Sequence, residues 1–200
     1  MDGLTALHNR YFEELRAFAE LHSVPIMHDH SIEFIKKYIK EHNVKTILEI
    51  GTGIGYSCIC MALVDKDIEV ISIEKDERRY LYAIKNIKKF FLENRITLIY
   101  SDALKVNLNQ KFDLILIDAA KGKYINFFEH FKKHLNKNGT IITDNVSCRD
   151  FIESNDELGS TNLRGLVNKI KNYIEFLKEN KEFATEFLSV GDGLAISQKK

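Results

Sequence analysis

The segment ILEIGTGIGYS, residues 47–57, joins an apolar stretch to a helical pattern through three closely spaced glycines. The residues from 46 to 50 predict a buried strand, and those from about 56 to 63 predict a helix. Glycines let the backbone turn sharply and approach a ligand closely. The first turn of the helix offers free N–H groups. We therefore expect a ligand at this turn rather than a bare connection.

On both sides of this segment the sequence alternates between strand and helix patterns. Further strands are predicted at 69–73, 96–100, 112–117 and 139–143, and two more lie between 182 and 197 around Gly191-Asp192-Gly193. Helical spacing covers about 81–91, 124–131 and 163–177. This alternation predicts a doubly wound α/β fold with a mainly parallel, seven-stranded, Rossmann-like sheet and one antiparallel strand.

Two helical patterns precede the sheet in residues 1–43, separated by Pro25. Ser31 is placed to cap the second of these helices, and Glu33 suits its positive end. We expect both helices to cover the site. At 200 residues the chain is expected to form a single domain, residues 1–200.

Composition excludes several classes of protein. The chain is 44% apolar and 29% charged, with 29 basic and 29 acidic residues, so a strongly basic nucleic-acid binder is not indicated, although a local basic face is allowed. Three cysteines without a CxxC pair favour neither a zinc site nor disulfides. There is no apolar run of about 18 residues and no secretory leader pattern. We expect a protein of the reducing cytoplasm with no membrane span.

The glycine spacing indicates which ligand the turn binds. A dinucleotide fingerprint, G-x-G-x-x-G counted from Gly51, needs a third glycine at position 56, which is Tyr56. Glu49 at the strand end would repel a phosphate and could pair with an amine. S-adenosylmethionine (SAM) has an α-amino group and no phosphate, so the motif favours SAM over NAD.

Carboxylates follow the next two strands. Glu74 ends the second strand, where it could accept hydrogen bonds from both ribose hydroxyls of a nucleoside. Ser101-Asp102-Ala103 ends the third, with its carboxylate placed to meet the adenine amino group. Glu74 is common to NAD and SAM sites and does not choose between them.

Oxygen ligands follow the fourth and fifth strands. Asp118 and the pair Asp144-Asn145 are expected to meet in space, because the two strands end at the same edge of the sheet. Two carboxylates and an amide oxygen suit Mg²⁺ or Ca²⁺. Lys121, three residues after Asp118, could act as a base toward a hydroxyl or as a fixed positive charge on a developing oxyanion.

Other candidate groups have simpler interpretations. His28-Asp29-His30 resembles a metal cluster, but neighbouring loop positions point apart. Tyr124 shares an apolar helical face with Phe127 and Phe131 and is expected to pack in the core. The basic run at 85–89, with Arg78, Arg79 and Arg95, is expected to be a solvated face and is a candidate for phosphate contacts.

Taken together, these residues resemble the cation-dependent, SAM-dependent O-methyltransferases, the family of catechol and caffeoyl-coenzyme A O-methyltransferases. The matching segments are ILEIGTGIGYS at 47–57, ISIEKD at 71–76, YSDAL at 100–104, FDLILIDAAKGKYINFF at 112–128, IITDNV at 141–146 and VGDGLAIS at 190–197. Within the family the chain is most similar to bacterial tRNA 5-hydroxyuridine methyltransferases, through HSVPIM at 22–27, IITDNV, and LVNKIKNYIEFL at 166–177. Residues 147–150 and 160–165 depart from the pattern of these relatives.

The resemblance implies a role for each matching residue. SAM would be bound by Met27, Glu49, Gly51, Gly53, Tyr56, Ser57, Glu74, Asp102, Ala103 and Asp118. Asp118, Asp144 and Asn145 would hold Mg²⁺, or Mn²⁺ or Ca²⁺ in its place, and Lys121 and Asp118 would be catalytic. Members of the family are commonly homodimers.

The resemblance also implies a reaction. The expected acceptor is 5-hydroxyuridine at the wobble position of a tRNA anticodon loop, giving 5-methoxyuridine. A small catechol-like molecule with two vicinal oxygens is the alternative acceptor. An NAD-dependent oxidoreductase and a non-catalytic SAM- or RNA-binding module are the rival classes.

Overall fold

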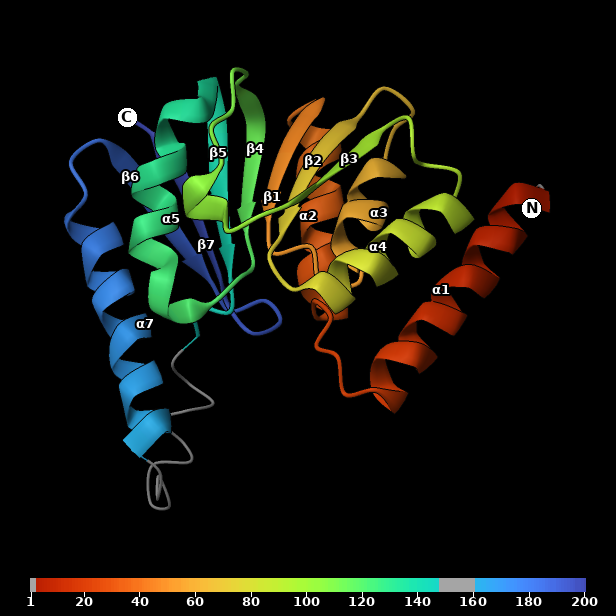
Figure 1. Ribbon diagram of the computed structural model, residues 1–200. Helices are drawn as coiled ribbons and strands as arrows, with labels where there is room; N and C mark the ends of the chain where they lie inside the picture. Colours follow the sequence, from red (N-terminus) through yellow and green to blue (C-terminus); the bar gives the residue numbers. More distant parts are fainter. Residues whose placement is uncertain (1–2, 148–160) are drawn as a thin grey trace.

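The computed structural model describes residues 3–147 and 161–200 and contains a seven-stranded sheet with helices on both faces (Figure 1). The strands are β1 (Thr46–Ile50), β2 (Glu69–Glu74), β3 (Ile96–Tyr100), β4 (Phe112–Ile117), β5 (Leu135–Asp144), β6 (Phe183–Leu188) and β7 (Leu194–Lys199). The helices are α1 (Gly3–Leu21), α2 (Asp29–Glu41), α3 (Tyr56–Ala62), α4 (Glu77–Lys89), α5 (Tyr124–Phe131) and α7 (Thr161–Glu179). Three short 3₁₀ turns are η1 (Ala103–Lys105), η2 (Lys121–Lys123) and η3 (Lys132–His134).

The strand order is β3-β2-β1-β4-β5-β7-β6, which confirms the predicted fold class. The pairs from β3 through to β5 are parallel, and β7 is antiparallel to both β5 and β6. After β1 the chain forms β2 and β3 on one side of β1, and it then returns to form β4 on the other side. A crevice therefore opens at the carboxyl ends of β1 and β4, where doubly wound folds bind ligands.

Two apolar layers hold the helices against the sheet. One cluster joins α2 and α3 to the sheet through fully buried residues such as Ile35, Ile47 and Ile59. The other joins α5 and α7 to the opposite face through Phe128, Phe131 and Tyr173. In Figure 1, α5 and α7 lie together on one side of the sheet and α2, α3 and α4 on the other. Burial on both faces explains why the parallel strands read as continuous apolar runs.

The structure corrects two element boundaries. Strand β5 begins at Leu135 rather than at Gly139, because Leu135 pairs with Phe112 before a register shift. Helix α2 begins at Asp29, and its N-cap is His28, whose Nδ1 accepts the His30 N–H at 3.1 Å. The prediction that Ser31 caps this helix is wrong. Ser31 is fully buried inside the first turn.

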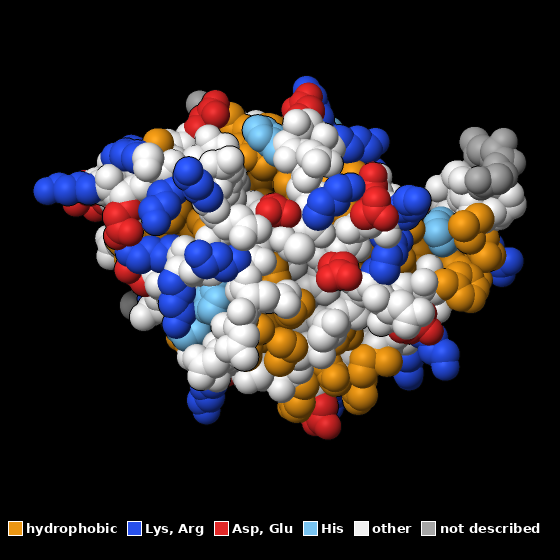
Figure 2. Space-filling model, turned by 90° about the horizontal axis from the view of Figure 1, so that it is seen from above, with side chains coloured by type: hydrophobic (Ala, Val, Ile, Leu, Met, Phe, Trp, Pro, Cys, Tyr) orange, Lys and Arg blue, Asp and Glu red, His pale blue; other side chains and the backbone are white. Residues whose placement is uncertain are grey.

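Figure 2 shows the molecule from above, relative to Figure 1. The viewer faces the amino ends of the parallel strands. Acidic and basic side chains are interspersed over this face rather than separated. This distribution agrees with the zero formal charge of the chain.

Candidate functional site

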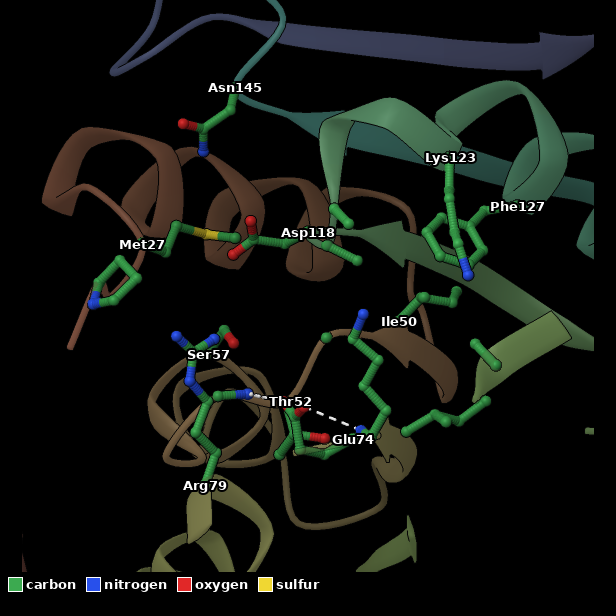
Figure 3. A pocket seen from close by; sticks show the side chains of 18 of the residues that line it. Met27, Ile50, Thr52, Ser57, Glu74, Arg79, Asp118, Lys123, Phe127 and Asn145 are labelled. Carbon is green, nitrogen blue, oxygen red and sulfur yellow. Dashed lines mark hydrogen bonds between the residues drawn. The ribbon is translucent and has the colours of Figure 1, made fainter. Parts of the chain in front are cut away.

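A cavity of about 530 Å³ lies at the carboxyl ends of the central strands. That volume is in the range of small-molecule and cofactor sites. Most of the predicted site residues line it: Met27, Gly51, Gly53, Tyr56, Ser57, Glu74, Asp102, Ala103, Asp118, Lys121 and Asn145. In Figure 3, Asp118, Asn145 and Met27 lie at one side of the cavity, and Lys123 and Phe127 lie at the other. Glu49 and Asp144 are not among the lining residues.

The glycine turn passes directly against the next strand. Ile50 pairs with Ile117 in the parallel ladder, and the Asp118 N–H continues it by donating to the Ile50 carbonyl at 3.0 Å. Gly51 has φ +101°, and a Cβ built there would lie 1.9 Å from the Asp118 carbonyl oxygen. Only glycine fits this position. The close approach brings the turn and Asp118 to the same cavity.

We expect Gly51→Ala to lower the free energy of unfolding by at least about 3 kcal/mol, because it combines a strained φ with a backbone clash. Gly53→Ala is the matched control. Gly53 also has a positive φ, +56°, but nothing lies within 4 Å of its added Cβ. Its cost should be about 1 kcal/mol, from the left-handed backbone alone. Urea unfolding of both variants measures the difference, and equal losses would show that the contact with Asp118 is unimportant.

Backbone N–H groups hold Glu74 in place at the end of β2. Its carboxylate accepts hydrogen bonds from the N–H groups of Gly53, Lys75 and Asp76, each at 2.8 Å. The side chain is only 6% exposed, yet it lines the cavity. A ribose would therefore meet a carboxylate whose position the turn itself fixes.

Asp102 is anchored from two sides. It accepts the Leu104 N–H at 3.1 Å, at the start of η1, and it pairs with Lys123 Nζ at 3.2 Å. The hydrogen bond from Leu104 is the main cause that lowers the pKa of Asp102. Lys123, which the sequence analysis missed, also lines the cavity. Only the fold shows that it reaches Asp102, because 21 residues separate the two.

Glu49 is not among the residues that line the cavity, and its predicted direct contact with SAM stays a prediction. Its side chain is fully buried, and its carboxylate accepts hydrogen bonds from the hydroxyls of Ser57 and Ser72. Ser72 also shares a 2.5 Å hydrogen bond with Thr52. Ser57 and Thr52 line the cavity, so hydrogen bonds link Glu49 to the cavity wall. Glu49 points to the face of β1 opposite to Leu48 and Ile50, and both faces of this strand are covered by apolar clusters.

Burial raises the pKa of Glu49 to about 7, against the hydrogen bonds from Ser57 and Ser72. A carboxyl group with a raised pKa in the folded protein contributes stability that is complete below its unfolded value of 4.5 and is lost as the pH rises through 7. The shift corresponds to about 3 kcal/mol.

Glu49→Gln should therefore flatten the loss of stability between pH 5 and pH 8 relative to the wild type. Urea unfolding at several pH values in this range measures the difference. Parallel curves for the two proteins would contradict the buried titration.

The oxygen ligands meet as the sheet predicts. Ile117 of β4 pairs with Thr143 of β5, so Asp118 and Asp144 follow at the next step of neighbouring parallel strands. Asn145, with φ +62°, turns out of β5 and donates from Nδ2 to Asp144 Oδ2 at 2.9 Å. Asp144 has no exposed surface and lies beneath the cavity wall that Asn145 forms.

The charge of Lys121 lowers the pKa of Asp118 by less than burial and the neighbouring carboxylates raise it. Burial raises the pKa of Asp118 and of Asp144, and the charge of Asp144 raises that of Asp118 further. Crowded carboxylates of this kind favour a bound cation. Among residues 3–147 and 161–200 no group of three His, Cys, Asp or Glu is arranged for a metal. The donor set here is instead two carboxylates and one amide oxygen, which fits a hard cation that keeps water or substrate oxygens as further ligands.

Lys121 and Ser31 complete this end of the cavity. Lys121 Nζ donates to Asn145 Oδ1 at 3.1 Å. Ser31 donates from Oγ to Asp144 Oδ1 at 3.3 Å, so α2 positions a carboxylate 113 residues away. The sequence analysis missed this contact because Ser31 has the residue type of an N-cap.

Three further residues are placed by the structure. Tyr124 is 1% exposed and donates to the Asp144 carbonyl at 3.0 Å, which confirms its place in the core. His28 and His30 contact each other at the start of α2, with ring centroids 5.0 Å apart. Arg79 is exposed, as expected, and it also lines the cavity, toward which it points in Figure 3. The departures from the family pattern at 148–150 and at position 160 lie outside the described residues.

Comparison with known proteins identifies the family. The model of the O-methyltransferase family matches residues 3–200. This chain belongs to the O-methyltransferase family. An Arabidopsis thaliana protein provisionally named a caffeoyl-CoA O-methyltransferase is 30% identical to this chain over 189 residues. The match covers 88% of this chain and 77% of the relative.

Solved structures agree. A Staphylococcus aureus protein, provisionally named a caffeoyl-CoA O-methyltransferase, superposes with a TM-score of 0.88 at 40% identity. The superposition covers 98% of the present chain and 97% of the Staphylococcus chain. A Bacillus cereus O-methyltransferase in complex with SAH (S-adenosylhomocysteine) shares the fold, with a TM-score of 0.80 at 23% identity over 96% and 91% of the two chains.

The family settles the class of the protein. It is a SAM-dependent O-methyltransferase, as the resemblance predicts, and neither an NAD-dependent oxidoreductase nor a binding module. None of the helices described in the structure is apolar over a length that could cross a membrane.

Proposed function

We propose that this methyltransferase transfers the methyl group of SAM to the 5-hydroxyl of 5-hydroxyuridine at the tRNA wobble position, with Mg²⁺ bound. The observation that carries the proposal is one cavity in which a nucleoside end, Glu74 and Asp102, faces an oxygen-ligand end, Asp118, Asn145 and Lys121. Such a cavity can hold a methyl donor and an oxygen acceptor side by side.

The donor would lie across the glycine turn. Glu74 would accept the ribose hydroxyls, Asp102 the adenine amino group, and the Gly51–Gly53 backbone would support the methionyl part. The Bacillus cereus structure, which shares the fold, holds SAH, the product that SAM leaves after methyl transfer. Holding donor and acceptor in line supplies about 7–11 kcal/mol of the barrier reduction in well-oriented reactions.

The cation would be held by Asp118, Asp144 and Asn145, with Mn²⁺ or Ca²⁺ as substitutes for Mg²⁺. When bound, it would chelate two adjacent acceptor oxygens and lower the pKa of the hydroxyl. Lys121, 3.1 Å from Asn145, would take the hydroxyl proton on Nζ when neutral, or stabilise the oxyanion when charged. The acceptor oxygen forms a bond to the methyl carbon as the carbon–sulfur bond breaks. The sulfonium becomes a neutral thioether, so no acid is needed for the leaving group.

The choice of tRNA rests on the similarity of residues 22–27, 141–146 and 166–177 to the tRNA methyltransferases. The 5-hydroxyl and 4-carbonyl of 5-hydroxyuridine offer the adjacent oxygens that the cation site requires. A wobble base lies in a single-stranded loop and can be splayed into a pocket at modest cost. The expected homodimer is part of the same proposal.

A small catechol-like acceptor is the second candidate. The names of the Arabidopsis and Staphylococcus relatives favour it, because both names refer to caffeoyl-CoA, an aromatic thioester. Two vicinal phenolic oxygens would satisfy the same cation site, so the site alone does not separate the two acceptors.

Methyl transfer from labelled SAM to tRNA that contains 5-hydroxyuridine tests the proposal, with Mg²⁺ or with a chelator, and with nucleoside mass spectrometry as the readout. Metal-dependent 5-methoxyuridine is the expected result. An inert tRNA alongside a methylated catechol would replace the proposed acceptor with the small-molecule one. Activity that survives the chelator would contradict the cation.

A further inference from the structure

One arginine of the N-terminal helix joins three elements beside the cavity. The guanidinium of Arg16, on α1, donates to the carboxylate of Asp29, the first residue of α2, and to the hydroxyl of Tyr56, the first residue of α3. The Tyr56 hydroxyl in turn donates to Asp29 at 3.3 Å. None of these contacts takes part in the proposed chemistry.

Tyr56 is the member of this cluster that lines the cavity. Its side chain is 3% exposed. Two α1 side chains contact its ring: Phe12 meets it edge-on with centroids 5.9 Å apart, and the Arg16 guanidinium lies 5.0 Å from its centroid. Helix α1 therefore supports a cavity wall that it does not itself form.

Helix α1 is otherwise peripheral. In Figure 1 it lies outside α4, at the edge of the molecule farthest from α7. Only Leu15 and Ala19 of this helix are buried. The connection from α1 to α2 does line the cavity, through Pro25, Ile26 and Met27. The Val24 N–H donates to the Ala19 carbonyl at 2.8 Å, so the position of α1 constrains where this connection begins.

We propose that Arg16 is a positioning residue of the donor site, which holds Tyr56 in the cavity wall and fixes α1 and the 22–28 connection against the cavity. The proposal rests on the proposed function in one respect, because the wall matters through the methyl donor that the cavity would hold.

The two arms of Arg16 differ in strength. The side chains of Arg16 and Asp29 are 43% and 58% exposed, and an exposed ion pair contributes little. The contact with Tyr56 is part-buried, charge-assisted and reinforced by the guanidinium over the ring. The Tyr56 arm should therefore carry the positioning, and Asp29→Asn should have a small effect.

Two measurements on the full chain test the proposal. Hydrogen exchange of residues 22–28, without any ligand, reports on the wall itself. Calorimetric binding of SAH, without acceptor or cation, reports on the donor site. Arg16→Met should raise the exchange and weaken SAH binding about tenfold, the size of one charge-assisted hydrogen bond.

Lys89→Met is the matched control. Lys89 pairs with Glu14 and lies 4.5 Å from the Tyr11 ring centroid, so it ties α1 to α4 away from the cavity. It should change neither readout. Equal losses in Lys89→Met and Arg16→Met would show a general docking of α1 and would overturn the assignment to Arg16.

A double-mutant cycle with Tyr56→Phe, which keeps the ring, tests the route. If Arg16 acts through the Tyr56 hydroxyl, the double variant should bind SAH as tightly as whichever single variant has the lower SAH affinity. Additive losses, or unchanged SAH affinity in Arg16→Met, would overturn the proposal. If the wild type failed to bind SAH, the proposed function would fail, whereas the exchange of residues 22–28 would still decide whether Arg16 holds the wall.

Discussion

Asp144→Ala is expected to abolish cation-dependent methyl transfer while leaving the fold intact. Losing a ligand that supports about 4 kcal/mol of transition-state stabilisation corresponds to about a thousandfold in rate. Asp144 has no exposed surface, and burial raises its pKa, so hydrogen bonds from Ser31 and Asn145 offset the cost of its charge only in part and a bound cation would offset it further. Without cation, the free energy of unfolding of the variant should therefore lie within about 1 kcal/mol of the wild type, because losing the buried charge offsets the loss of the acceptor for Ser31 and Asn145.

Thermal unfolding with and without Mg²⁺ measures this directly. The wild type should gain stability with added cation, because a ligand that binds the folded state stabilises it. The variant should not. Wild-type rates in Asp144→Ala, or the same cation-induced rise in melting temperature, would refute the assignment of Asp144 as a ligand.

Lys121→Met should lower kcat by about 10²- to 10⁴-fold, the range for a positioned proton-transfer group, while SAH affinity stays unchanged. Lys121 contacts Asn145, at the acceptor end of the cavity. Lys123, two residues on in the same short turn, contacts Asp102 at the nucleoside end. Lys123→Met is therefore the matched control and should weaken SAH binding with little change in kcat.

Lys121→Arg separates the two roles that the geometry permits. An arginine keeps the positive charge but does not lose its proton in proteins. Recovery of activity in this variant would assign Lys121 to charge stabilisation, and continued loss would assign it to proton transfer. Equal losses of kcat and SAH affinity in Lys121→Met would contradict both roles.

Much of this site could be predicted from the sequence because the carboxyl ends of parallel strands lie at the same edge of the sheet. Asp118 and Asp144 follow strands that the apolar runs reveal, and adjacent strands bring them together. The displaced third glycine favoured SAM over a dinucleotide, and the family agrees.

The rest depended on contacts that local pattern does not carry. Ser31 looked like a helix cap, yet its hydroxyl contacts Asp144 across the fold. Glu49 was interpreted as a partner for an amine, but the sequence did not reveal that its carboxylate accepts hydrogen bonds from Ser57 and Ser72. Helical spacing in α1 indicated a buried face but not the guanidinium that reaches Tyr56. In each case a tertiary contact decided what the side chain does.

The order of the last two strands has a consequence for biosynthesis. Strand β6 leaves the ribosome before β7, but β7 lies between β6 and β5 in the sheet. A nascent chain that ends before β7 therefore has an unpaired β5 edge, the kind of edge that pairs wrongly with other chains. The turn before β7 also supplies Asp192 to the cavity and binds the backbone of Val146 and Ser147 beside Asn145. Glu74 and Asp102 thus leave the ribosome long before β7, whereas the end of the cavity beside Asn145 gains Asp192 and its backbone contacts only with the final turn and strand.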